Sequence, residues 1–210
     1  MPLLEHLGRT VEGVTEVVPA CLGLSIVRID QRDSFTIAVS DETVAVLEGV
    51  QYLDGGPELD AASSQHWGEV SLKSLNGRWP LYTAASVRAG VRSTLTLPVT
   101  DNELTLGAVR VYAGREDAFE GCADEVARLV EGGEATELVI GSATTLTTRR
   151  LAERAPLSLR AQGALNRAIG ALTLHLDTDV AAAYERLVDA AQRAGITVDR
   201  LALTVVDLHD

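Results

Sequence analysis

Hydrophobic and polar positions divide the chain into a first part rich in strands and a last part made of helices. Apolar residues recur at three- and four-residue steps over residues 3–22, which predicts an amphipathic helix. Two β-rich runs follow at residues 25–30 and 35–40. The polar stretch between these runs favours a β-hairpin.

The middle of the chain continues with short elements separated by turn residues. Residues 57–64 follow a Gly-Gly-Pro turn and predict a short helix, and residues 69–75 predict a strand. A helix is predicted over residues 80–89, where Gly90 stops it. Residues 93–99 and 104–112 alternate cleanly and predict two strands joined by a turn at residues 100–103.

Helical sequence then dominates. Residues 122–154 predict a helix with a possible break at Gly132 and Gly133, because glycine is a poor helix former. Pro156 disfavours helix at the residue before it and marks a boundary. These features predict two domains, at residues 1–154 and 155–210.

Three apolar stripes predict three helices in the last domain. The stripes are Ala161, Leu165, Ala168, Leu172 and Leu176, then Val180, Tyr184, Leu187, Ala191 and Ala194, then Val198, Leu201 and Val205. Asp177 or Asp179 can cap the second helix, Gly195 can end it, and Thr197 can cap the third. So small a unit buries little surface, so we expect it to pack on the preceding helix or on a second subunit.

Composition narrows the class of protein. The 210 residues contain no apolar run near the roughly 20 residues of a membrane-spanning helix, and the N-terminus lacks the features of a secretory signal. We therefore expect a cytoplasmic protein. The two cysteines and four histidines are scattered, which predicts neither a disulfide nor a metal site and favours buried, structural cysteines.

The formal net charge of −12 opposes non-specific binding to nucleic acid, so any such binding must be local. Lys73 is the only lysine, and the other cations are arginines, which suit phosphate and base recognition. A GC-rich genome would produce the same bias.

Several spaced motifs in the first domain resemble those of actinobacterial GAF sensor domains. They are GGPELDA at 55–61, GRWPLY at 77–82, AGVRSTLTLPV at 89–99 and LGAVRVY at 106–112. The last domain is similar to an ANTAR output domain in AIGAL at 168–172, in the small-residue helix around Ala182 and Leu187, and over residues 198–206.

The resemblance to GAF-ANTAR regulators implies an α+β fold: an antiparallel GAF-type sheet flanked by helices, then a small three-helix ANTAR-type domain. It also implies a small-molecule ligand for the sensor, a homodimer formed through helices, and RNA hairpin loops as the target of the output domain in transcription antitermination. Three positions depart from the usual pattern, because Ile169 replaces a lysine, Gln162 an arginine and Glu58 a cysteine.

The candidate RNA-binding residues follow from the helical stripes and the resemblance. The arginines each precede an apolar position, which places them at the edges of the helices: Arg160, Arg167, Arg186, Arg193 and Arg200, with Gly170 beside them. They could grip phosphates or stack on loop bases. Alternatively, they are solvated flanks paired with neighbouring acids, since residues 151–210 contain six arginines and eight acidic residues.

Aromatic and cationic residues also gather near the loops expected to border the sensor pocket. They are Trp67, Arg78, Trp79, Tyr82 and Arg92, and they could bind an anionic or heteroaromatic ligand. Alternatively, Trp79 and Tyr82 fill the core while the two arginines bind backbone carbonyls.

No catalytic pair, phosphate loop or cofactor motif is found in the sequence, so we expect no enzyme and no cofactor. The sequence thus predicts a signal-responsive, RNA-binding transcription antiterminator. The alternative is a dimeric ligand-sensing or protein-interaction module whose output domain no longer binds RNA.

Overall fold

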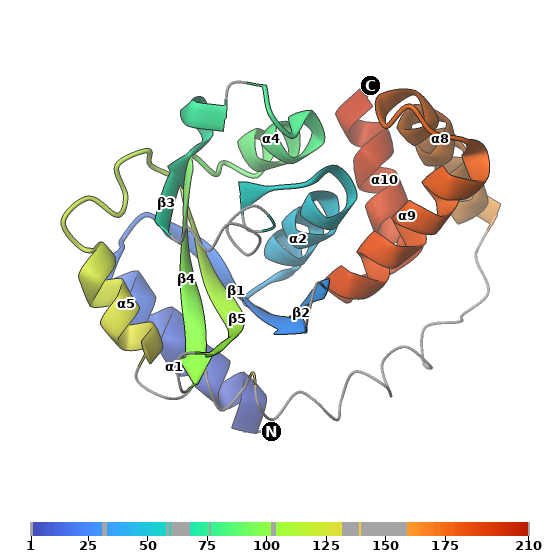
Figure 1. The fold of residues 1–210 in the computed structure, drawn as a ribbon. Helices are drawn as coiled ribbons and strands as arrows, with labels where there is room; N and C mark the ends of the chain where they lie inside the picture. Colours follow the sequence, from blue (N-terminus) through green and yellow to red (C-terminus); the bar gives the residue numbers. More distant parts are fainter. Residues whose placement is uncertain are drawn as a thin grey trace.

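The structure is a computed structural model that describes residues 2–30, 33–57, 59, 68–75, 77–101, 104–131, 139 and 159–209. Its fold is α+β, with one five-stranded antiparallel sheet and helices on both of its faces (Figure 1). The described residues include no helix with the length and apolar character needed to cross a membrane.

The sheet has the strand order β2-β1-β5-β4-β3. The strands are β1 (Cys21–Asp30), β2 (Asp33–Val39), β3 (Gly68–Ser71), β4 (Ser93–Asp101) and β5 (Leu104–Ala113). The predicted hairpin is confirmed, since β1 pairs antiparallel with β2. The two alternating strands, β4 and β5, are also confirmed.

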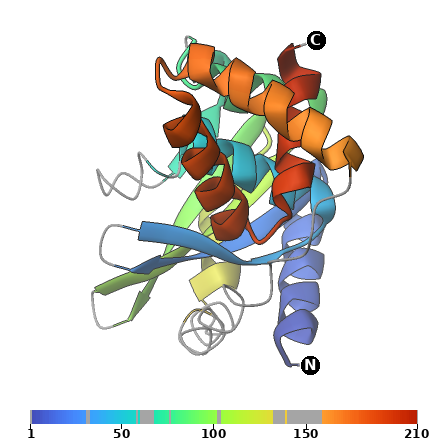
Figure 2. The same ribbon diagram turned by 90° about the vertical axis from the view of Figure 1, so that its right-hand side faces the viewer.

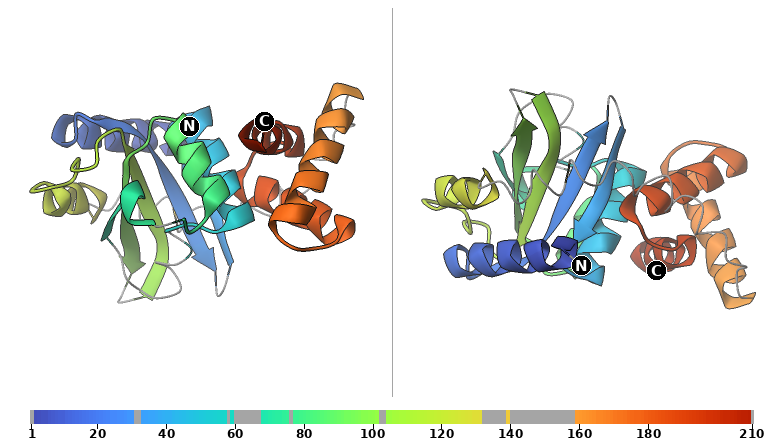
Figure 3. Two further views of the ribbon diagram at one scale, coloured as in Figure 1. Left: turned by 90° about the horizontal axis from the view of Figure 1, so that it is seen from above. Right: turned by 90° about the horizontal axis from the view of Figure 1, so that it is seen from below.

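Helices α1 (Pro2–Val17) and α5 (Ala123–Glu131) cover one face of the sheet, and α2 (Glu42–Asp54) and α4 (Pro80–Arg88) cover the other (Figures 1 and 3). A short 3₁₀ helix, η1 (Leu72–Leu75), follows β3. We call this assembly the sheet unit. The last helices are α8 (Leu159–His175), α9 (Val180–Ala194) and α10 (Val198–His209), and we call them the helical unit.

Several predicted boundaries need correction. The first helix ends at Val17, and residues 21 and 22 already belong to β1, because Val18 turns into the core and the chain enters the sheet there. Residues 72–75 form η1 instead of extending β3. Apart from Pro57 and Leu59, the expected helix at 57–64 falls outside the described residues, as do most of the expected helix at 122–154 and the domain boundary.

The patterns above predict no element over residues 42–54, where the structure has α2. Nearly every residue of α2 from Val44 to Leu53 is buried, because the helix lies between the sheet and the helical unit. A helix that is buried on all sides shows no amphipathic stripe, which explains why periodicity misses it.

The helical unit packs on α2 through a shared hydrophobic core, on the side of α2 away from the sheet (Figures 1 and 2). The three predicted stripes are largely confirmed, but Val180 and Tyr184 are exposed, because Ala183 and Ala190 turn inward instead. The helical unit therefore packs on the sheet unit, and the segment before it, one of its two expected supports, lies outside the described residues.

The predicted helix caps lie where the sequence placed them. Asp179 accepts a hydrogen bond from the Ala182 amide at 2.8 Å, which decides between the two aspartates. Gly195 ends α9 in the left-handed region with φ of 69°. Thr197 accepts from the Arg200 amide at 3.3 Å at the start of α10.

Candidate functional site

The two faces of the sheet differ in chemistry, although both are buried. Towards α1 and α5 the central strands present aliphatic residues, including Leu24, Ile26 and Val109. Towards α2 and α4 the alternate positions carry polar side chains that are at most 3% exposed: Ser25, Thr36, Thr94, Thr96 and Arg110. We call this surface the polar sheet face.

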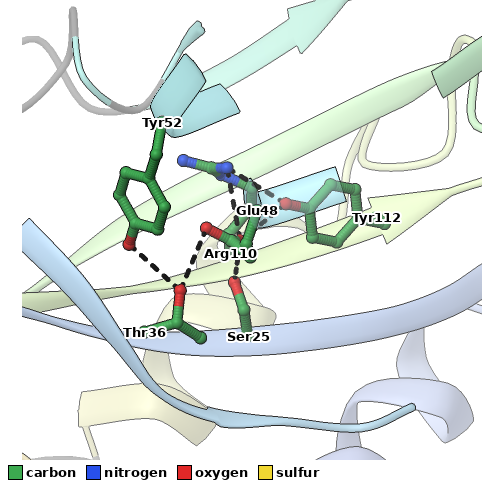
Figure 4. Close-up of polar contacts among 6 residues, drawn as sticks. All are labelled: Ser25, Thr36, Glu48, Tyr52, Arg110 and Tyr112. Atoms are coloured by element: carbon green, nitrogen blue, oxygen red, sulfur yellow. Dashed lines mark hydrogen bonds and ion pairs between the residues drawn. The ribbon is translucent and has the colours of Figure 1, made fainter. Parts of the chain in front are cut away.

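Glu48 of α2 lies at the centre of a hydrogen-bonded cluster on the polar sheet face (Figure 4). Its Oε1 accepts from Ser25 Oγ, from the Tyr112 hydroxyl at 2.6 Å and from Arg110 Nη1 at 3.4 Å. Arg110 also donates to the Tyr112 oxygen at 3.0 Å. These bonds join one helix to two strands.

A second branch of the cluster runs towards the helical unit. Thr36 Oγ1 donates to Glu48 Oε2 at 3.5 Å and lies 3.0 Å from the Tyr52 hydroxyl (Figure 4). Since Tyr52 also belongs to α2, both ends of this branch are held by the same helix.

The cluster contains a fully buried ion pair, because the Arg110 and Glu48 side chains are both 0% exposed. Such a pair gives little net stability, but removing one partner leaves an uncompensated buried charge and costs about 3–5 kcal/mol. Burial also holds the pKa of the Tyr112 phenol well above its usual value. Glu48 adds to this effect and Arg110 opposes it.

Two further buried hydroxyls, Ser86 Oγ of α4 and Thr94 Oγ1 of β4, have no hydrogen-bond partner among the described residues. An unsatisfied buried hydroxyl costs about 1–3 kcal/mol. A polar ligand at this face would recover that cost. The polar sheet face is therefore the candidate sensing site.

The predicted sensor residues do not converge as a group. Arg78 stacks on the Trp79 ring at 4.1 Å, and Arg92 donates to the Val91 carbonyl at 2.9 Å. Tyr82 is fully buried and lies close enough to Tyr112 to influence its pKa. Of the set, Tyr82 alone is thus placed at the polar sheet face by these contacts, and Trp67 lies outside the described residues.

Sequence reasoning did not select Ser25, Thr36, Glu48, Arg110 or Tyr112 as a site. The available signal was Arg110, a charged residue inside an otherwise apolar strand. Charged residues are almost never fully buried unless they are paired. Glu48, its partner, could not be found, because α2 itself was not predicted.

The helical unit packs closely against the side of α2 that faces away from the sheet. A Cβ atom at Gly49 would lie 3.0 Å from Ile196 Cδ1, 3.2 Å from Leu201 Cδ1 and 3.5 Å from Ala194 Cβ. Glycine at this position therefore lets α9 and α10 approach α2 closely.

Arg193, a predicted RNA-binding residue, is bound to the sheet unit instead of facing solvent. Its Nε donates to the Ser34 carbonyl at 2.7 Å and its Nη2 to Ser34 Oγ at 3.1 Å. Its guanidinium lies 4.3 Å over the Tyr52 ring, and its Nη1 pairs with Asp189 at 3.6 Å. All three nitrogens and one face of the guanidinium are thus engaged.

Arg200 also contacts the sheet unit, since its Nε lies 2.9 Å from Glu42 Oε1. Both side chains are at least half exposed, so the pair contributes at most about 1 kcal/mol. The Arg193 side chain is only 20% exposed and makes several bonds, so its contact contributes more than that of Arg200.

His175 provides a third link between the two units. Its Nε2 lies 2.7 Å from Asp54 Oδ1 at the end of α2. The other carboxylate oxygen of Asp54 accepts from the Leu81 amide at 2.8 Å and so caps α4. One buried aspartate therefore joins α2, α4 and α8.

The remaining RNA-binding candidates are directed to solvent. Arg167, Gly170 and Arg186 are exposed, and a Cβ at Gly170 would meet open space. The side chain of Arg160 lies outside the described part of the chain. Ile169 is only 8% exposed and packs in the hydrophobic core, so this position does not face a ligand.

No known family model matches the sequence, and no curated protein is similar to it. Within the described residues, no group of three or more His, Cys, Asp or Glu side chains could hold a metal ion. Cys21 and Cys122 are partly buried, and burial raises the pKa of both thiols.

Proposed function

We propose that the protein is a signal-responsive, non-catalytic regulator in which a GAF-type sheet unit controls an ANTAR-type helical unit that binds RNA hairpin loops and prevents transcription termination. One observation carries the proposal. Helix α2 contributes Glu48 to the buried polar cluster and Gly49 to the contact with α9 and α10.

The sensor role is supported by the polar sheet face. A face that was purely structural would be expected to be aliphatic, as the opposite face is. Buried hydroxyls without partners at Ser86 and Thr94 suit a small polar ligand whose hydrogen bonds replace those of water. A ligand there would alter the packing of α2 and hence the surface on which the helical unit rests.

The output role is supported by the charge of α8. This helix carries Arg160, Arg167 and His175 and no acidic residue, in a chain with a formal net charge of −12. Its exposed side includes Arg167 and Gly170, where a phosphate could approach the backbone closely. Local cations of this kind are what binding to a hairpin loop requires.

A second candidate function is favoured by the Arg193 and Arg200 contacts. If these arginines serve only to hold the units together, the protein is a ligand-sensing or protein-interaction module without RNA binding. We expect a homodimer under either function, and a cytoplasmic location.

The experiment that separates the two functions is binding of the purified protein to a pool of RNAs that each carry two hairpins with randomised loops. An antiterminator enriches particular loops, and its affinity falls as salt rises, because phosphate contacts release counterions. If the protein retains no more hairpin RNA than a matched double-stranded control at moderate salt, the second function is favoured.

A further inference from the structure

The surface of the sheet unit that receives the helical unit includes Ser34, Glu42, Gly49 and Tyr52, and we call these four residues the docking surface. It binds two of the arginines that the output function would use, Arg193 and Arg200. We propose that the docking surface competes with RNA for these arginines. The closed form, in which the helical unit rests on the docking surface, then has the lower affinity for RNA, and the open form, in which the two units separate, has the higher affinity. This inference rests on the proposed function.

The competition follows because the guanidinium of Arg193 uses the same donors and the same face for the docking surface and for RNA. Arg193 donates to the carbonyl and the hydroxyl of Ser34, pairs with Asp189 and stacks on Tyr52. A bidentate phosphate contact through Nε and Nη2 needs the donors that Ser34 occupies, and a base that stacks on the same face would displace Tyr52. RNA contact through this edge and face of Arg193 therefore requires its release from Ser34 and Tyr52.

The docking surface is also connected to the candidate sensing site. The Tyr52 ring lies beneath Arg193, and the Tyr52 hydroxyl lies 3.0 Å from Thr36, which donates to Glu48. A ligand that draws Thr36 or Glu48 into new hydrogen bonds moves the side chain on which Arg193 stacks. Ligand binding and release of Arg193 are thereby coupled through α2 and β2.

A disulfide can hold the closed form. A Cβ at Gly49 would lie 3.5 Å from Ala194 Cβ, which is within the range of Cβ separations in disulfides. The lock variant carries Gly49→Cys and Ala194→Cys, with Cys21 and Cys122 replaced by serine. The same protein is then compared in its oxidised and reduced forms, and Gly49→Cys alone serves as the control for the substitution.

A wedge can favour the open form. Gly49→Leu places a side chain where Ile196 and Leu201 lie within 3.2 Å of the new Cβ, and the three atoms nearest to that Cβ belong to Ile196, Leu201 and Ala194 and not to an arginine. The matched control is Gly8→Leu on α1, where a Cβ would meet open space. Opening is measured as loss of hydrogen-exchange protection in α2 and α9, independently of RNA.

Binding is measured with the pool of randomised two-hairpin RNAs. We expect the oxidised lock to bind at least about tenfold more weakly than the reduced lock, because apparent affinity scales with the fraction of competent protein. We expect the wedge to bind more tightly than Gly8→Leu. Equal binding by the oxidised and reduced lock would overturn the competition and leave the proposed function intact. Absence of hairpin binding in the reduced lock, the wedge and the wild type would overturn the proposed function itself.

Discussion

At the scale of single residues, hydrogen bonds to the Glu48 carboxylate hold the polar sheet face together. Glu48 accepts from Ser25, Arg110 and Tyr112, so one carboxylate satisfies groups on two strands. Since neither side chain is exposed, this carboxylate and the Arg110 guanidinium compensate each other's buried charge. The strand containing Arg110 could be predicted from alternation, but its partner comes from a helix that periodicity does not reveal.

Glu48→Gln tests this dependence. The amide keeps the shape of the side chain but removes the carboxylate that pairs with the buried Arg110 charge, so we expect the free energy of unfolding to fall by about 3 kcal/mol. Urea denaturation measures the change. The control is Glu16→Gln on the exposed side of α1, where we expect a change within about 0.5 kcal/mol. Equal small changes in both variants would contradict the role given to Glu48.

Tyr112 gives the protein a predictable response to alkali. Burial raises the pKa of this phenol, so the folded state keeps a proton that the unfolded chain releases at about pH 10. The free energy of unfolding should therefore fall as the pH rises above about 10, and the fall ends at the higher pKa of the folded state.

Urea denaturation between about pH 9 and 11 measures this alkaline loss. Tyr112→Phe should reduce the loss, because the titrating group is gone. Tyr184→Phe changes an exposed tyrosine of α9 and should leave the loss unchanged. A loss of the same size in all three proteins would show that other groups cause it.

At the scale of elements, the helical unit was largely predictable and α2 was not. Stripes, caps and a C-terminal glycine identify α8–α10, because each helix has one buried and one exposed side. Helix α2 is enclosed by the sheet and by α9 and α10, so its sequence resembles neither amphipathic pattern. What the helical unit packs on depends on long-range contacts, such as Gly49 with Ile196, that no local pattern contains.

Asp179 caps the helix that contributes most to the docking contact. Asp179→Ala removes the acceptor for the Ala182 amide and should lower the free energy of unfolding by about 1 kcal/mol, whereas Asp179→Asn keeps an acceptor and should cost little. Urea denaturation followed by circular dichroism measures both variants. An equal loss in both would assign the effect to the charge at the helix N-terminus and not to the cap.

At the scale of the whole molecule, the order of layers places α2 between the candidate sensing site and the helical unit (Figure 3). Helix α1 lies on the opposite face of the sheet, away from the helical unit (Figures 1 and 3). A change of charge on α8 should therefore act on RNA locally, whereas the same change on α1 alters only the net charge.

The burial of Ile169 determines which residue can carry an added charge. The family resemblance suggests Ile169→Lys, but this residue packs in the core, and an ammonium there would destabilise the fold. Asn166 lies one turn before Gly170 on the exposed side of α8, beside Arg167. Asn166→Arg is thus the substitution that adds a cation to this surface.

We expect Asn166→Arg to raise affinity for the selected hairpins and to steepen the salt dependence by about one phosphate contact, because each new contact releases about one more counterion. The control is Thr15→Arg on α1, an exposed position that adds the same charge. Filter binding over a series of salt concentrations measures both slopes. An equal gain in both variants would show that net charge alone controls binding. If Asn166→Arg gives no gain, the exposed side of α8 is not part of the RNA interface.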